Sequence, residues 1–250
     1  MSDAQDASEI RQTLSVLHPP ASVVEIRVLG VPGRGRPYNI AGYFSDHDAA
    51  ARVAAEIDLR RKPKGIYLVM NEVRPELLAR SPDRMTDYPD STTSDADITS
   101  RNWLLVDIDP IRSTGVPSSE VELIAARKVA EQAKRWLIDQ FEFSEPVEAI
   151  SGNGYHLLFP ISLENCDEST QLIKGVLNAA SERFGGDNTP TGLPHVTVDT
   201  SVFNAGRITK LYGTMARKGH SIDGRPQRRS RLVCIPDYVK RRWDGDVDVS

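Results

Sequence analysis

Apolar and polar positions alternate in short blocks along the first hundred residues, which predicts a mixture of strands and helices. The segment 30–37 contains three glycines, two prolines and two arginines. It separates two segments in which apolar and polar residues alternate, as they do in strands. It therefore predicts the loop of a β-hairpin. The polar stretch 81–100 has no core pattern of its own, so we place a boundary between two modules near residue 100. The elements expected here are helices within 1–20, at 47–60 (capped by Ser45 or Asp46) and at 75–80, and strands at 23–29, 39–44 and 65–71.

The second half of the chain has longer and more regular patterns. Small or apolar residues recur every four positions from Val121 to Leu137, as one buried face of a helix requires. The tetrapeptide at 151–154 combines serine, asparagine and two glycines between apolar segments, which predicts a second hairpin. The elements expected here are strands at 102–109, 147–150, 155–161, 195–199, 207–213 and 230–235, and helices at 118–141 (capped by Ser118 or Ser119) and 168–184.

These elements predict an α+β protein. The order strand–helix–strand–strand–helix–strand in the second half is that of the split βαβ arrangement found in ferredoxin-like and RNA-recognition-like folds. We therefore expect one domain over 1–250, made of an N-terminal α/β module at 1–100 and an RNA-recognition-like module at 101–250.

Composition limits the broad class of the protein. The 250 residues are 39% hydrophobic and 26% charged, which is ordinary for a globular chain. The formal net charge of -4 gives no bulk signal of nucleic-acid binding, although a local basic groove would be sufficient. Two distant cysteines, Cys166 and Cys234, favour a reduced compartment. The polar start at 1–9 and the lack of an apolar run near ~20 residues predict a cytoplasmic protein without a signal peptide or membrane span.

Two aspartates at the end of one apolar strand are the first candidate site. The segment Trp103-Leu104-Leu105-Val106-Asp107-Ile108-Asp109 places Asp107 and Asp109 on the same side, because side chains alternate along a strand. Two packed carboxylates repel each other and lose solvation, so a positive charge is expected beside them. Divalent cations prefer carboxylate oxygens, and the pair therefore predicts a metal site.

The second hairpin carries a candidate anion site. Its glycines allow a tight turn and close approach of a ligand to the backbone, particularly at Gly154. Ser151, Asn153 and exposed backbone N–H groups can meet phosphate oxygens, and His156 begins the next strand. Taken alone, the same pattern describes an ordinary hairpin turn.

A third group of residues combines an acid with bases. Asp199 ends an alternating segment and can supply a third metal-binding carboxylate. Arg207 can bind phosphate through its planar fork, and Lys210 adds a point charge. Lys218 extends this basic set. Three carboxylates holding two divalent ions, beside bases that neutralise a triphosphate, are the residues that nucleotidyl transfer requires.

Other polar residues are weaker candidates. Asn71 ends a strand and Arg112 follows the aspartates, so both are candidates to contact a nucleotide. Basic clusters also occur at Arg34 and Arg36 and at 60–64, and such clusters are usually solvated. All of these clusters are candidates to bind the phosphates of a nucleic-acid template, together with the cluster favoured most for that role, Arg225, Arg228, Arg229 and Arg231.

The order of these motifs resembles the archaeo-eukaryotic primase superfamily, and most closely its primase-polymerase branch of phages, plasmids and mobile elements. Asp107 and Asp109 match the first, metal-binding motif; Ser151 to His156 match the second, nucleotide-binding motif; and Asp199 matches the third. The resemblance covers about residues 23–220. It implies the catalytic core of that superfamily, template-directed synthesis from NTPs or dNTPs on a primer and single-stranded DNA, magnesium or manganese as cofactor, and a helicase domain or protein as a possible partner.

Two alternatives account for part of the same pattern. A nucleotide-sugar glycosyltransferase also uses Asp-x-Asp to hold a metal and a nucleotide diphosphate, but it gives no role to Asp199, Arg207 and Lys210. A catalytically inactive single-stranded-DNA-binding replication module would need no intact acids. The enzyme hypothesis, a DNA primase-polymerase, uses all three groups of residues.

Overall fold

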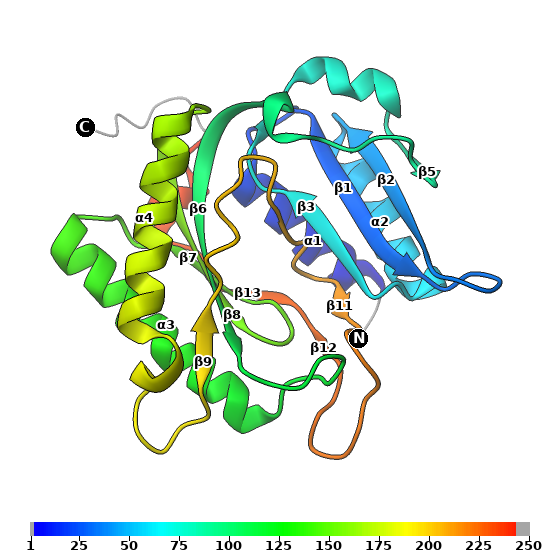
Figure 1. The fold of residues 1–250 in the computed structure, drawn as a ribbon. Helices are drawn as coiled ribbons and strands as arrows, with labels where there is room; N and C mark the ends of the chain where they lie inside the picture. Colours follow the sequence, from blue (N-terminus) through cyan, green and yellow to red (C-terminus); the bar gives the residue numbers. More distant parts are fainter. Residues whose placement is uncertain (1–2, 244–250) are drawn as a thin grey trace.

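The computed structural model describes residues 3–243 and contains two large antiparallel sheets and a small two-stranded one, β11-β12 (Figure 1). The first sheet has the order β10-β3-β1-β2-β5. Its centre is the hairpin predicted from the Gly/Pro-rich segment, in which β1 pairs with β2. The strands of this sheet are β1 (Val24–Val31), β2 (Tyr38–Phe44), β3 (Gly65–Val69), β5 (Arg84–Asp87) and β10 (Ile208–Lys210).

Two helices pack beside the first sheet, α1 (Asp3–Leu17) and α2 (His47–Arg61). The side chain of Asp46 caps α2 by accepting hydrogen bonds from the backbone N–H groups of Asp48 and Ala49, which identifies the cap among the two predicted candidates. Alanine-rich sequence lets α2 approach α1 and the sheet closely, and Ala50, Ala51 and Ala54 are buried there.

The second sheet has the order β13-β7-β8-β6-β4, and β9 pairs with the far end of β6. Its four central strands therefore run β7-β8-β6-β9, the order of a split βαβ unit, as predicted. The strands are β4 (Glu72–Val73), β6 (Ile98–Pro110), β7 (Val147–Ile150), β8 (Tyr155–Glu164), β9 (Val196–Val198) and β13 (Arg231–Cys234).

Helices α3 (Glu120–Phe141) and α4 (Asp167–Phe184) cover the outer face of the second sheet, on the left in Figure 1. Ser119 caps α3 in a reciprocal capping box with Glu122. The predicted apolar face is buried at Ala125, Val129, Ala133 and Leu137. The prediction was wrong for Val121, which is exposed because it lies in the first turn, beyond the edge of the sheet.

The stretch 81–100 is more structured than its polar composition predicted. It contains β5, a 3-10 turn at Asp95–Asp97 and the start of β6, so the aspartate strand begins four residues earlier than expected. Strand β5 pairs with β2 and Thr93 is buried, so backbone pairing orders a segment that has few apolar side chains. The remaining short elements are η1 (Pro75–Arg80), η3 (Gly186–Asn188), β11 (Met215–Ala216), β12 (Arg228–Arg229) and α5 (Asp237–Lys240).

The two sheets face each other across the candidate site. Leu105, Asp107 and Asp109 of β6 line a cavity together with residues of β3 and β10. Side-chain alternation turns the intervening residues of β6 to the opposite face, where α3 packs against the sheet. No helix within residues 3–243 is long and apolar enough to cross a membrane. Both cysteines are free thiols.

Candidate active site

A cavity of ≈ 290 Å³ between the two sheets collects most of the residues singled out in the sequence. Strands β3 and β10 of the first sheet form one wall, and β6, the β7–β8 turn and the start of β8 form the other. The predicted site residues that line it are Asp107, Asp109, Ser151, Asn153, His156, Asp199, Arg207, Lys210 and Lys218.

Strand pairing places three polar residues in one row across the second sheet. Asp107 on β6 lies opposite His156 on β8. Strand β9 pairs with the other edge of β6. Asp199, the residue after β9, lies opposite Asp107, and its N–H donates to the Asp107 carbonyl at 2.9 Å. Residues opposite each other in an antiparallel pair share a face of the sheet. This register explains why positions 107, 156 and 199, far apart in sequence, line the same cavity.

Asp107 carries a carboxylate oxygen without a hydrogen-bond partner. Its Oδ1 is buried and lies 3.2 Å from His156 Nε2, but the geometry of this contact is not that of a hydrogen bond. Burial opposes ionisation of Asp107, while His156, Lys218 and Arg207 favour it, and together they lower the pKa of Asp107. The side chain is therefore a partly buried carboxylate with His156 beside it and Lys218 and Arg207 near it.

Asp109 is in a different environment on the same face. Burial, and then the neighbouring Asp107 carboxylate, raise the pKa of Asp109. Its Oδ1 lies 3.9 Å from Arg112 Nη1. A Cβ atom added to Gly154 would lie only 2.2 Å from this Oδ1, so the absence of a side chain at position 154 makes room for the carboxylate.

His156 is held by a buried network behind the aspartates. Its Nδ1 lies 2.8 Å from the Tyr212 hydroxyl, which lies 3.3 Å from Thr209 Oγ1. The tautomer with its proton on Nε2 faces Asp107 and lets the Tyr212 hydroxyl donate to Nδ1. Tyr212 is fully buried, as expected for a core residue, and burial raises its pKa, so it stays a neutral donor.

The glycine-rich turn is tied into the surrounding chain. Ser151 Oγ accepts from the Gly154 N–H at 3.0 Å, and Asn153 Oδ1 accepts from the Ser118 N–H at 3.0 Å. Gly152 has φ +103, and a Cβ there would lie 2.4 Å from Ala216 Cβ on β11. Only glycine satisfies both the backbone conformation and this contact. The turn is thus fixed against the β11–β12 hairpin.

Three basic residues face the aspartates. Arg207 donates through Nη2 to the Ser201 carbonyl and hydroxyl, while its Nε is buried without a hydrogen-bond partner. Lys210 is buried and donates to the Met215 carbonyl at 2.9 Å, and burial lowers its pKa to about 7. Lys218 is exposed at the rim of the cavity. These side chains give the cavity a positive wall opposite the acids.

The three acids differ in how well they fit a cation site. Their donor chemistry fits a hard divalent ion, because three carboxylates line one cavity and Asp107 Oδ1 has no hydrogen-bond partner. Within the described part of the chain, however, no three His, Cys, Asp or Glu side chains already converge as a group that could hold a metal. Asp199 Oδ1 is turned to the Ser201 N–H at 2.8 Å, and Asp109 lies against Gly154.

Two weaker nucleotide candidates lie outside the lining of this cavity. Asn71 is buried, donates to the Ala205 carbonyl and accepts from the backbone N–H groups of Asn102 and Trp103. Arg112 donates to the Val116 and Pro110 carbonyls and approaches Asp109. These hydrogen bonds give Asn71 a structural role at the junction of the two sheets, and they leave Arg112 as a neighbour of one aspartate.

Most of the arginines considered for a template have intramolecular partners. Arg225 binds Glu122 through both terminal nitrogens, at 2.7 and 2.8 Å. Arg228 donates to the Ser118 carbonyl, and Arg229 donates to the Gly213 carbonyl. Arg231 is exposed on β13. Arg225 and Arg228 therefore hold the segment 217–229 against the start of α3, and the structure gives no open basic surface at these two positions.

The cavity contains residues that the sequence pattern did not reveal. Tyr67 and Thr209 lie on β3 and β10, and Lys64 precedes β3. Burial, and then Asp107 and Asp109, raise the pKa of Tyr67. Within its strand Tyr67 reads as one apolar residue among others, so no local signal distinguishes it. Tyr67 is recognised as a residue that lines the cavity only once β3, paired with β10, is placed across from the aspartate strand.

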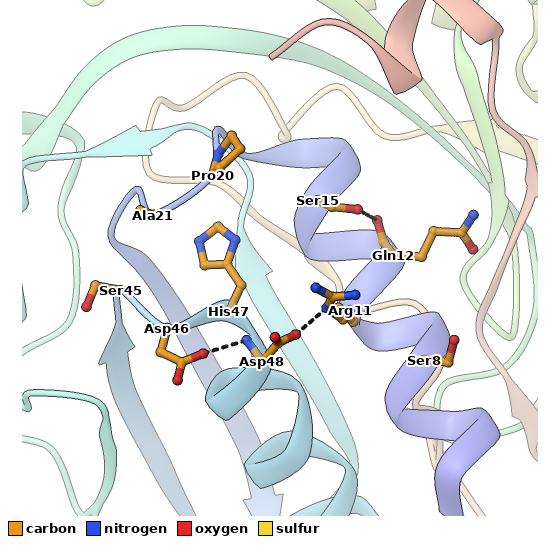
Figure 2. A pocket seen from close by; sticks show the side chains of 10 residues that line it. All are labelled: Ser8, Arg11, Gln12, Ser15, Pro20, Ala21, Ser45, Asp46, His47 and Asp48. Atoms are coloured by element: carbon orange, nitrogen blue, oxygen red, sulfur yellow. Dashed lines mark hydrogen bonds and ion pairs between the residues drawn. The ribbon is translucent and has the colours of Figure 1, made fainter. Parts of the chain in front are cut away.

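A different cavity, of ≈ 660 Å³, lies between α1 and the start of α2 (Figure 2). Figure 2 shows that its charged groups bind one another: Arg11 pairs with Asp48, and Asp46 accepts from the Asp48 N–H. His47 Nε2 donates to the Ser22 carbonyl at 2.9 Å. Since these polar groups are already satisfied by the helix cap and by ion pairing, we place the active site in the cavity between the sheets.

Comparison with known proteins gives a fold likeness only. No family model matches the chain, and no curated protein matches it in sequence. Among solved structures, the chain is similar to the polymerase domain of ligase D from Mycobacterium tuberculosis, determined in complex with DNA. The identity is 13% and the TM-score 0.47, over 99% of this chain and 90% of that chain.

Proposed function

We propose that this protein is a DNA primase-polymerase, which transfers a nucleotidyl group from an NTP or dNTP to a primer 3′-hydroxyl or an initiating nucleotide. One observation carries the proposal. The two side-chain atoms found buried without a hydrogen-bond partner in the described structure are Asp107 Oδ1 and Arg207 Nε, and both residues line the same cavity. A metal ion can bind this carboxylate oxygen beside His156 Nε2, which lies 3.2 Å from it, and a phosphate oxygen can accept from the guanidinium. A metal-bound nucleoside triphosphate supplies both.

The acids would hold the cofactor. Asp107, Asp109 and Asp199 are the residues that would bind two Mg²⁺ or Mn²⁺ ions, after their side chains turn from Ser201 and Gly154 toward the cavity. When bound, such ions stabilise the attacking oxygen and the leaving pyrophosphate as Lewis acids. His156 fixes the orientation of Asp107 from the neighbouring strand, with Tyr212 behind it.

The basic wall would position the triphosphate. Arg207 can offer its unpartnered Nε–H to a phosphate oxygen, and Lys210 and Lys218 add charge beside it. Ser151 accepts hydrogen bonds within its turn, so its own O–H is available as a further donor. In the reaction a bond forms between the primer 3′-oxygen and the α-phosphorus. The bond from the α-phosphorus to pyrophosphate breaks, and the 3′-hydroxyl proton is released to solvent.

The test is incorporation of a labelled nucleotide into a primed single-stranded template by the full chain, with Mg²⁺ or Mn²⁺. Asp107→Asn keeps the shape of the side chain and removes its charge, and it should lower the rate by at least about 10²-fold. Asp139→Asn, on the exposed surface of α3, is the matched control and should leave the rate unchanged. Equal rates for Asp107→Asn and the unmodified protein would refute the proposal. Turnover of a nucleotide sugar without a template would favour a glycosyltransferase instead.

A further inference from the structure

A stacked pair of tyrosines is exposed on the first sheet, away from the aspartates. The rings of Tyr38 on β2 and Tyr88 just after β5 are 4.6 Å apart between centroids and inclined by 18°. Tyr88 is 69% exposed, so most of its surface is in solvent. An exposed aromatic ring that packs only against another ring on one side has a free face on which a further planar group can stack.

The backbone holds Tyr88 in this position at a conformational cost. Its φ is +55, in the left-handed region that bulky residues rarely adopt. The Tyr88 N–H donates to the Asn39 carbonyl at 3.0 Å, which fixes the residue beside β2. Tyr38 is only partly buried and also lies 3.3 Å from Arg61 Nη1 through its hydroxyl. Each tyrosine of the pair is therefore held by a hydrogen bond, Tyr88 through its backbone and Tyr38 through its hydroxyl.

The tyrosine pair lies along a path that leads to the active site. A cavity of ≈ 630 Å³ is lined by Tyr38, Tyr88 and Arg36, and it shares Leu29 and Ile208 with the lining of the active-site cavity. A further cavity, of ≈ 590 Å³, shares Tyr38 and Tyr88 and extends to Arg34. The three cavities thus adjoin one another between the aspartates and the β1–β2 hairpin.

Along this path, the charged side chains that have no intramolecular partner among the described residues are positive. Arg34 and Arg36 are exposed on the hairpin loop, and neither side chain has a hydrogen bond or ion pair to any residue in 3–243. Asp87 also lines the outer cavity, but it is bound to Arg61 at 2.8 Å. Free guanidinium groups next to stacked aromatic rings are the features that bind a single strand through its phosphates and its bases.

We propose that Tyr38 and Tyr88 form a stacking platform for a base of single-stranded nucleic acid that enters the active-site cavity, with Arg34 and Arg36 contacting its phosphates. The inference rests on the proposed function, because it assigns the strand that would serve as template. Among the basic clusters that the sequence offers for a template, it favours Arg34 and Arg36 on the hairpin of the first sheet over the arginines of the second half. A double helix would not present the free face of a base, so the platform selects unpaired strands.

The experiment measures binding of a labelled single-stranded oligothymidylate to the full chain by fluorescence anisotropy, without nucleotide or metal. Tyr88→Ala should weaken binding by about tenfold, whereas Tyr88→Phe should bind like the unmodified protein. Phe141→Ala removes a comparably exposed ring, 54% exposed, from α3 on the other side of the molecule and should have no effect. An abasic oligonucleotide should bind the unmodified protein more weakly, and Tyr88→Ala should no longer distinguish it from oligothymidylate.

Undiminished binding by Tyr88→Ala, or equal binding of the abasic strand, would overturn the platform. This binding test is independent of the incorporation test for the proposed function, because Asp107→Asn should lose incorporation and keep strand binding. A chain that binds strands through Tyr88 but incorporates no nucleotide would refute the polymerase and leave the platform. If the protein incorporates nucleotides but Tyr88→Ala binds the strand normally, the platform is refuted and the polymerase proposal stands.

Discussion

Asp107 and Asp109 share one face of one strand, yet their surroundings shift their pKa values in opposite directions. Burial disfavours the charged form of both carboxyl groups. Asp107 has His156 beside it and the cations Lys218 and Arg207 near it, and together these outweigh the burial. Asp109 has the Asp107 charge as its second strongest influence, and Arg112 only partly offsets it. The surrounding groups therefore favour the charged form of Asp107 and disfavour that of Asp109.

Gly154 tests this arrangement at the scale of one residue. In Gly154→Ala the new methyl would meet Asp109 Oδ1 at 2.2 Å and the Ile108 carbonyl at 2.5 Å, so the carboxylate must move. We expect incorporation to fall by at least about tenfold, as displacement of a reacting group by ~1 Å does. Gly175→Ala on α4 is the control, because a Cβ there meets nothing within 4 Å. Full activity in Gly154→Ala would show that the position of Asp109 does not matter.

The chemistry of individual residues is predictable from sequence only where local rules apply. Alternation alone places Asp107 and Asp109 together, and it predicts that Asp199 ends another strand, whereas the pairing of that strand with β6 is seen only in the structure. Asn71 and Arg225 look equally suitable for a ligand, but their partners, Ala205 and Glu122, lie more than a hundred positions away in sequence. No local pattern shows that a polar side chain is already occupied by so distant a group.

At the scale of elements, the hairpins, the long helices and the split βαβ order follow from patterning and turn residues. The strands β1 and β2 and the helices α2, α3 and α4 occur within one or two residues of their predicted bounds. The segment 84–87 was not recognised as a strand because it has only one apolar residue and is an edge strand held by pairing with β2. Edge strands carry weak hydrophobic patterns, since little of their surface is buried.

The attachment of α1 to the first sheet should depend on pH. His18 follows α1, is 1% exposed, and its Nε2 donates to the Val69 carbonyl on β3 at 2.9 Å. Burial, and then the charge of His47, lower the pKa of His18 to about 3, against 6.5 for an unperturbed histidine. Between these values the unfolded chain binds a proton that the folded chain does not, so stability should rise with pH by up to about 1.4 kcal/mol per pH unit.

Urea unfolding at a series of pH values measures this slope. The variant His18→Gln removes the titrating group and should show a flatter dependence than the unmodified protein between pH 3 and 6.5. His195→Gln is the control, because its side chain is 57% exposed and its removal should leave the slope intact. An unchanged slope in His18→Gln would mean that His18 is not buried as a neutral ring.

At the scale of the whole molecule, strands cross the predicted boundary near residue 100 in both directions. Strand β10 belongs to the first sheet although it comes from the second half, and β4 joins the second sheet from the first half. Trp103 Nε1 donates to the Leu17 carbonyl at 2.9 Å across the same junction. One hydrophobic cluster includes residues of α1, both sheets and the helices of the second half. The cavity with the aspartates exists only because these parts are joined.

Because the two halves of the chain share both sheets and one hydrophobic cluster, we expect the chain to unfold as one unit. The three tryptophans, Trp103, Trp136 and Trp243, all come from the second half of the chain, whereas far-UV circular dichroism reports on all helices and sheets. We expect the urea transitions from fluorescence and from circular dichroism to coincide, as they do in a two-state domain. Two separated midpoints would instead show that the modules at 1–100 and 101–250 fold independently. The division of the chain into modules stays a prediction until this is measured.

The central claim concerns a template. The most direct measurement supplies the full chain with a primer, a homopolymer single-stranded DNA template and one labelled nucleotide at a time, with Mn²⁺ or Mg²⁺. The account predicts that only the nucleotide complementary to the template base is added, that its identity changes when the template is exchanged, and that a chelator abolishes the product. Addition that ignores the template base, or no addition under any metal, would contradict it.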